Sequence, residues 1–127
     1  MKQYDYIILG AGASGLMLAY RMSLDSYFDE KSVLIIDYVK DKGNDRTWCY
    51  WEEGAGEWDD LLTKSWSKVF FGSNSFSKTI TINPFNYKMI RSEILYQKFW
   101  QKIGLKSNMC FKEERVETYA EIDKGVK

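Results

Sequence analysis

The sequence predicts an α/β fold, in which a βαβ unit with a parallel sheet is followed by a small β excursion. Residues 4–9 and Val33–Asp37 are short apolar runs rich in β-branched side chains, as in buried parallel strands. Between them Leu16, Leu18, Ala19 and Met22 recur with helical spacing. Strand, glycine turn, helix and strand within the first 37 residues make a βαβ unit, whose crossover is right-handed in nearly all proteins.

The middle of the chain is less regular. Residues 38–57 carry three glycines, mixed charges and many aromatic side chains, which predicts a long loop, and residues 58–64 predict one or two helical turns. Strands are predicted over residues 68–72 and 76–83, joined as a hairpin by a turn rich in glycine, serine and asparagine. This hairpin is the expected β excursion.

The last third of the chain is predicted to hold one helix. The single proline marks a turn, and apolar residues four apart then predict a helix over Ser92–Ile103. Short strands are predicted over residues 108–112 and 115–119, and no element over residues 120–127. Because no later helix is expected to return to a further strand, we expect the parallel sheet to be incomplete.

The composition excludes several kinds of site and partner. The 127 residues are 45% hydrophobic and 17% aromatic, which is typical of a globular domain. Without histidine the chain has no Ser-His-Asp unit and no His-based zinc motif. Cys49 and Cys110 are too few for a four-cysteine zinc site, and we expect both to be reduced and no metal to bind. Eighteen Lys+Arg balance eighteen Asp+Glu, so no basic field favours nucleic acid.

The N-terminal segment is not predicted to be a targeting signal. Residues 6–20 are almost uncharged, but Asp5 stands where a signal peptide has basic residues, and three glycines interrupt the apolar run. The run is also shorter than the roughly 20 residues that span a bilayer. We therefore expect a cytoplasmic protein.

A dinucleotide-binding fingerprint follows the first strand. Six residues fit the pattern G-x-G-x-x-G: Gly10, Ala11, Gly12, Ala13, Ser14 and Gly15. In this pattern Gly10 permits the tight turn, Gly12 lets the backbone approach a pyrophosphate, and Gly15 lets the helix pack against the strand. The helix N-terminus offers N–H groups and a positive dipole end to the phosphates.

The acidic residue that this fingerprint requires is also present. Asp37 ends the second strand, 22 residues beyond Gly15, where it can accept both hydroxyls of an adenosine ribose and repel a 2′-phosphate. The alternative is an incidental glycine turn without a ligand. The register of strand, helix and acid favours a Rossmann-like site for an ADP-containing dinucleotide, and leaves FAD and NAD both open.

A second, narrower motif lies between the second predicted strand and the hairpin. The octet NDRTWCYW, residues 44–51, resembles the N-D-x-T-W-x-[FY]-W stretch of lycopene cyclases. The opening residues 4–20 and the helix start Ile90-Arg91-Ser92 also resemble that family, as does the order of these motifs. The resemblance covers nearly the whole chain, and the octet is its most specific part.

This resemblance implies an FAD-dependent enzyme of carotenoid biosynthesis. Lycopene cyclases close the ends of lycopene into β-ionone rings without net redox change, and they require flavin that NAD(P)H has reduced. By analogy Arg91 meets the cofactor and Val116 lies near adenine. Arg46 can meet a phosphate or a carboxylate with its planar guanidinium group, and the alternative is an exposed loop arginine. The expected cofactor-binding residues are Gly10, Ala11, Gly12, Ala13, Ser14, Gly15, Asp37, Tyr38, Arg46, Arg91 and Val116.

The resemblance also implies that residues 1–127 are the N-terminal part of a longer FAD-binding protein. The acidic segment credited with proton transfer and the substrate-binding sheet of these cyclases have no counterpart here. We therefore expect no catalysis by this fragment alone. We further expect peripheral membrane contact of the full enzyme, and self-association of the fragment through an unpaired sheet edge.

Aromatic and acidic residues in and beside the octet are the candidate catalytic groups. Trp48 and Trp51 are assigned to the flavin or substrate side, because they belong to the octet that resembles lycopene cyclases; aromatic faces there would stabilise a carbocation. Trp58 and Trp66 are assigned to the core. Glu52 is the candidate general acid, with a solvated loop carboxylate as the alternative. Cys49 is expected to be a buried structural thiol.

Two other functions fit the same residues. One is another FAD-dependent oxidoreductase, of the hydroxylase or polyprenyl reductase type, in which the octet would be a coincidence. The other is a non-catalytic dinucleotide-binding module.

Overall fold

The computed structural model describes residues 3–127, which divide into two compact units. The first comprises the described residues up to Lys42 together with Tyr96–Lys127, and the second comprises Gly43–Leu95. No helix within residues 3–127 is long and apolar enough to cross a membrane.

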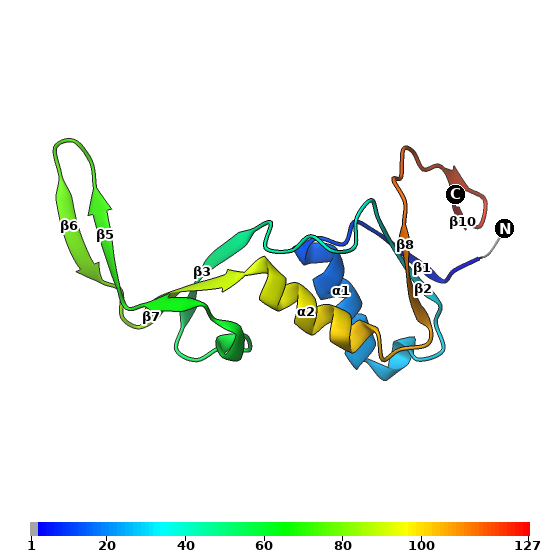
Figure 1. The fold of residues 1–127 in the computed structure, drawn as a ribbon, viewed down its shortest axis with the longest axis horizontal. Helices are drawn as coiled ribbons and strands as arrows, with labels where there is room; N and C mark the ends of the chain where they lie inside the picture. The colour runs from blue at the N-terminus through cyan, green and yellow to red at the C-terminus, as the bar shows by residue number, and fades with distance from the viewer. Residues whose placement is uncertain (1–2) are drawn as a thin grey trace. The chain divides into compact units, whose positions relative to one another are not determined.

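The first unit is built on a three-stranded parallel sheet in the order β1-β2-β8, as Figure 1 shows. The elements that build it are β1 (Tyr6–Leu9), α1 (Ala13–Leu24), the short 3₁₀ helix η1 (Ser26–Phe28), β2 (Val33–Asp37), most of α2 (Ser92–Ile103) and β8 (Met109–Glu113). Tyr6 lies opposite Val33, and Val33 lies opposite Met109 on its other side. The predicted βαβ unit and α/β class are confirmed.

The core of this unit lies around the central strand. Val33 and Ile35 of β2 are fully buried, because a strand with a neighbour on each side has little surface left. Leu16 and Ala19 of α1 are also fully buried. The ring centroids of Tyr20 in α1 and Phe99 in α2 are 4.9 Å apart. The helical spacing of apolar residues therefore corresponds to the packed faces of the helices, except at Leu18 of α1, which is exposed because it lies on the other side of the helix from Leu16.

The C-terminal part of the sheet corrects two predictions. The expectation that no later helix returns to the sheet is wrong, since α2 leads into β8, which pairs in parallel with β2. The strand predicted over residues 108–112 is confirmed as β8, whereas residues 115–119 form no strand. The tail, predicted to lack structure, forms a short hairpin of β9 (Glu121–Ile122) and β10 (Gly125–Val126). Within residues 3–127, β1 and β8 each pair only with β2, which leaves two open edges.

The second unit is antiparallel. It contains a three-stranded sheet in the order β3-β7-β4 and a separate hairpin, β5–β6, which forms a two-stranded arm in Figure 1. The elements are β3 (Thr47–Glu53), the 3₁₀ helix η2 (Asp59–Leu61), β4 (Lys64–Trp66), β5 (Lys68–Gly72), β6 (Ser77–Thr81), β7 (Phe85–Arg91) and the first turn of α2. The predicted hairpin is confirmed as β5–β6.

None of the three strands of this sheet was predicted. The segment expected to be a long loop over residues 38–57 contains β3, and β7 fills the space between the predicted turn and α2. The predicted helical turns over residues 58–64 reduce to η2, after which Lys64 begins β4. β3 is a strand because β7, far along the chain, supplies its hydrogen-bond partners from Thr47 opposite Arg91 to Glu53 opposite Phe85.

The two segments that carry the resemblance are joined in this unit. The NDRTWCYW octet runs into β3, and Ile90-Arg91-Ser92 ends β7 and begins α2, so the segments are neighbours in the sheet. The hydroxyl of Ser92 accepts from the N–H of Arg46 at 3.0 Å and donates to the carbonyl of Gly43 at 3.3 Å. The N–H of Ser92 donates to the carbonyl of Arg46 at 2.9 Å. A buried serine thus ties the start of the octet to the start of the helix.

Candidate dinucleotide-binding site

The turn between β1 and α1 has the conformation that the fingerprint predicts. Gly10 adopts φ +96°, a region that side-chain-bearing residues rarely enter. Its N–H donates to the carbonyl of Ile36 at 2.8 Å, which extends the β1–β2 ladder into the turn. The first helical hydrogen bond then runs from Leu16 to the carbonyl of Gly12 at 2.9 Å. The chain therefore changes from strand to helix within a few residues of the strand end.

The other two fingerprint glycines differ in their surroundings. A Cβ on Gly15 would lie 1.9 Å from the carbonyl oxygen of Gly10, so only glycine fits at this contact between helix and turn. A Cβ on Gly12 would meet nothing within 4 Å. Gly12 caps α1 without a side-chain hydrogen bond, and the first turn of α1 has no acidic residue. The backbone at Gly12 is thus open to a ligand, and the dipole end of α1 is not neutralised by its own first turn.

Asp37 lies beside this turn at the end of β2. Its Oδ2 accepts from the N–H of Ala11 at 2.6 Å and from the Nζ of Lys42 at 2.9 Å, and its Oδ1 accepts from the N–H of Val39 at 3.4 Å. Burial, the largest single influence, raises the pKa of this carboxyl. The hydrogen bonds from Lys42, Ala11 and Val39 together outweigh burial and hold the pKa of Asp37 below its usual value. Asp37 is therefore ionised at neutral pH and can accept hydrogen bonds only.

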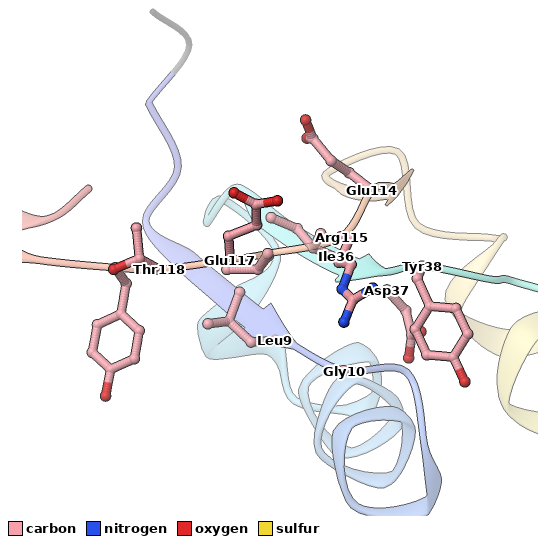
Figure 2. A pocket seen from close by; sticks show the side chains of 11 residues that line it. Leu9, Gly10, Ile36, Asp37, Tyr38, Glu114, Arg115, Glu117 and Thr118 are labelled. Carbon is pink, nitrogen blue, oxygen red and sulfur yellow. The ribbon is translucent and has the colours of Figure 1, made fainter.

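A pocket of about 460 Å³ lies at the carboxyl ends of the parallel strands, and Figure 2 shows side chains from all three strand ends around it. This is the edge at which open parallel sheets bind ligands. Leu9 ends β1, Asp37 ends β2, and the segment after β8 completes the wall. The lining residues are Leu9, Gly10, Ile36, Asp37, Tyr38, Glu114, Arg115, Val116, Glu117, Thr118 and Tyr119.

The structure brings several predicted site residues together in this pocket. Gly10, Asp37, Tyr38 and Val116 all line it, although Val116 lies in a link without regular secondary structure and not in the predicted strand. Ala11 joins them through its hydrogen bond to Asp37. The roles of these residues toward a cofactor stay predictions.

The sequence reasoning missed the other residues of the link after β8. Arg115 and Tyr119 line the pocket with Val116. These residues could have been predicted from the strand at residues 108–112. If that strand is placed in the parallel sheet, the residues that follow it lie at the same edge of the sheet as Asp37. Ser14 and Ala13 lie in the first turn of α1 and do not line the pocket.

Arg46 and Arg91 belong to the second unit. Both are exposed, and the Nη1 of Arg46 donates to the carbonyl of Asp45 at 3.1 Å. Arg91 ends β7 opposite Thr47. Their predicted part in cofactor binding stays a prediction.

The two candidate tryptophans lie on opposite faces of β3. Trp48 alternates with Cys49, Tyr50 and Trp51 along the strand, so Trp48 is half-buried on one face and Trp51 is exposed on the other. The two tryptophans therefore do not form one continuous aromatic surface on the strand. Cys49 shares the exposed face, so its assignment as a buried thiol is wrong, and both cysteines are free.

The exposed face carries a row of three aromatic rings. The centroids of Trp51 and Tyr87 are 5.0 Å apart, and those of Tyr87 and Trp66 are 5.8 Å apart. Trp66 is half-buried within this row. A hydrogen bond between the side chains of Tyr87 and Cys49 is the largest cause that raises the pKa of Tyr87.

Glu52 is held by a buried lysine on the other face. The Nζ of Lys88 donates to Glu52 Oε2 at 2.8 Å, to Asp59 Oδ1 at 2.6 Å and to the carbonyl of Gly54 at 2.9 Å, which uses all three of its N–H groups. The hydrogen bond to Asp59 is the main cause that raises the pKa of Lys88, and its counterpart lowers the pKa of Asp59. Glu52 is therefore engaged in an ion pair with Lys88, and its role as a general acid stays a prediction.

Tyr50 lies on the same face, opposite Lys88. Its hydroxyl is buried without a hydrogen-bond partner among the residues that the structure describes. Burial is the main reason that the pKa of Tyr50 is raised. Lys88 was not predicted as a notable group, because a lysine in an unrecognised strand resembles a surface residue.

Solved structures with this fold come from larger proteins. A mutant of PqsL from P. aeruginosa matches with a TM-score of 0.68 and 14% identity, over 98% of this chain and 37% of that one. The flavin-dependent brominase Bmp2 matches with a TM-score of 0.58 and 16% identity, over 98% of this chain and 33% of that one. The chain thus spans about a third of the length of these two structures. None of the curated proteins matches this sequence.

The family is shown by sequence. The profile described as "Lycopene cyclase protein" matches residues 5–126, which is nearly the whole chain. That match includes the fingerprint turn, Asp37, the octet and the link after β8. The fold, the turn and the motif agree with it, and the chain belongs to the lycopene cyclase protein family.

Proposed function

We propose that this chain binds the ADP half of FAD at the pocket formed by β1, β2 and β8. The observation that carries the proposal is the meeting of the Gly10–Gly15 turn and the ionised Asp37 at one edge of a parallel sheet. The space beside the backbone at Gly12 is open, so a pyrophosphate has room to approach it. Membership of the lycopene cyclase family supports FAD over NAD, and one structure of the same fold is described as a flavin-dependent brominase.

Each part of the site has its own task in this proposal. The N–H groups at the start of α1 hold the pyrophosphate, because they and the helix dipole favour negative charge. Asp37 accepts hydrogen bonds from the adenosine ribose. Val116 and Tyr119, in the link after β8, line the side of the pocket assigned to adenine.

We propose further that the full-length protein is a lycopene β-cyclase, which closes the ends of lycopene or a related polyene into β-ionone rings without net redox change. Flavin reduced by NAD(P)H supplies charge stabilisation or proton transfer when it is bound. The residues of this chain bind and orient that cofactor, and the catalytic acid is not placed among them. Because the substrate dissolves in membranes, the proposal includes a cytoplasmic protein with peripheral membrane contact.

Flavin content tests the first step. The purified chain is expected to show a flavin absorption spectrum, or to acquire one after incubation with FAD, and to release FAD on denaturation. The Asp37→Asn variant should bind FAD more weakly, because a neutral amide accepts fewer hydrogen bonds and offers no charge. A chain that binds NADH and not FAD would refute the proposal.

The cyclase activity is tested on the full-length protein. Conversion of lycopene to a product with β-ionone rings, with no change in the number of hydrogens, is the expected result. Oxidation or hydrogenation of the polyene would instead favour the hydroxylase or reductase alternative, and no reaction with any polyene would favour the non-catalytic module.

A further inference from the structure

The ribose-binding carboxylate is already occupied by the protein itself. Three donors contact Asp37, namely the N–H groups of Ala11 and Val39 and the ammonium group of Lys42. A carboxylate accepts about four hydrogen bonds, two at each oxygen. Since Oδ2 accepts from both Ala11 and Lys42, its capacity is used, and only Oδ1 has capacity left. A ribose diol that binds both oxygens therefore requires one donor to leave.

Of these three donors, only Lys42 can leave at low cost. The N–H of Ala11 is fixed by the turn after β1, and the N–H of Val39 is fixed two residues after the end of β2. Lys42 reaches Asp37 with a flexible four-carbon side chain, and its Nζ lies 4.9 Å from the ring centroid of Tyr38. The side chains of Lys42 and Asp37 are only 9% and 6% exposed, so this is a largely buried ion pair.

We propose that Lys42 is a displaceable counterion that occupies Asp37 Oδ2 in the free protein and sets the affinity for the ribose diol of the dinucleotide. The ribose hydroxyls replace the ammonium group on Oδ2, and Lys42 moves away from the carboxylate when the ligand binds. This inference rests on the proposed dinucleotide site. Lys42 is a specificity-determining residue, because its contact opposes only those ligands whose ribose carries hydroxyl groups.

The consequence for binding has a definite sign. In the wild-type protein, the cost of breaking the Lys42–Asp37 ion pair reduces the free energy of binding that the ribose contact provides. Without the ammonium group, Asp37 is a buried carboxylate that lacks its counterion, and the ribose hydroxyls relieve this state. Removal of the amino group of Lys42 should therefore tighten ribose binding. If Lys42 instead attracted the phosphates of the ligand, its removal would weaken binding.

Lys42→Met and Lys40→Met form a matched pair for the test. Both remove one positive charge from the same segment, but Lys40 does not contact Asp37, and its Nζ lies 5.2 Å from the ring centroid of Trp100. Calorimetric titration of the full chain with ADP and with 2′,3′-dideoxy-ADP, at one ionic strength, measures the effect. Lys42→Met should bind ADP about tenfold more tightly than wild type, the worth of one charge-assisted hydrogen bond. Binding of the dideoxy compound should not change, and Lys40→Met should match wild type for both ligands.

The outcomes separate this inference from the proposed function. If wild type binds ADP and Lys42→Met binds it equally or more weakly, Lys42 is not a displaceable counterion, and the dinucleotide site stands. If tightening is equal for ADP and dideoxy-ADP, the effect is not at the ribose and the inference is overturned. If neither protein binds ADP, the site and the inference fall together. Lys42→Gln, which keeps a donor but no charge, decides the matter if Lys42→Met does not fold, with a smaller gain expected.

Discussion

Replacing Gly15 by alanine gives the sharpest test of the fingerprint turn. The added Cβ would lie 1.9 Å from the Gly10 carbonyl oxygen, 3.1 Å from the Gly10 carbonyl carbon and 3.3 Å from Ile8 Cγ2. The first two are backbone atoms, so no side chain can rotate to relieve the contact. Either the turn or the first turn of α1 must move by about 1 Å or more to restore an ordinary contact distance.

The magnitude follows from two opposing terms. Overpacking a rigid contact costs about 3 kcal/mol at the upper end of the usual range. Alanine is favoured over glycine within a helix by about 1 kcal/mol, which offsets part of this cost. We expect a net loss of about 2 kcal/mol of unfolding free energy, or roughly 8 °C in the unfolding midpoint for a domain of this size.

Gly12→Ala is the matched control, because the same substitution in the same turn meets nothing within 4 Å. Thermal unfolding followed by circular dichroism should show Gly15→Ala destabilised and Gly12→Ala close to wild type. Titration with FAD should show weaker binding for both, since the methyl group of Gly12→Ala occupies the surface where the pyrophosphate approaches. A Gly15→Ala protein as stable as wild type would refute the steric reasoning, and a Gly12→Ala protein that binds FAD normally would refute the assignment of the pyrophosphate.

Other changes test the second unit, the pH dependence and the sheet edges. Lys88→Met should lower the unfolding midpoint more than Lys64→Met, an exposed lysine of the same sheet, because it leaves two carboxylates without their shared cation. Equal midpoints would mean that the ion pairs of the buried Lys88 add no stability. The lowered pKa values of Asp37 and Asp59 stabilise the fold above their unfolded values near 3.9, and this contribution is lost as pH falls through the lower folded values. The midpoint temperature of unfolding, measured from pH 7 to pH 2, should therefore decrease once the pH is below about 4. The decrease should be smaller in Asp37→Asn. The open edges of β1 and β8 predict self-association, and a monomer at all concentrations in sedimentation would contradict it.

The first unit was largely predictable because its signals are local. The apolar run of β2, the turn from Gly10 to Gly15 and the spacing of Leu16 and Ala19 each report their structure within a short window. The same signals placed Asp37 at the end of a parallel strand beside the turn, which the hydrogen bond from Ala11 bears out. The helix over Ser92–Ile103 was also predicted with its boundaries as observed.

The second unit depended on partners distant in sequence. Thr47–Glu53 alternates half-buried and exposed residues, but the sequence around it is rich in glycine and charge and resembles a loop. Its strand hydrogen bonds go to Phe85–Arg91, about forty residues later, so neither strand could be recognised without the other. The burial of Lys88 has the same origin, since its three acceptors come from β3, the following turn and η2.

By itself, the sequence determined the βαβ unit, the fingerprint turn, its acidic partner and the family to which the motifs belong. Only the tertiary structure decided that α2 returns to a third parallel strand, that the link after it forms one wall of the pocket, and that Lys42 occupies Asp37. The physical reason is that strand and helix periodicity and glycine geometry act over a few neighbouring residues. Strand pairing and side-chain ion pairs instead depend on which distant segments the folded chain brings within hydrogen-bond distance.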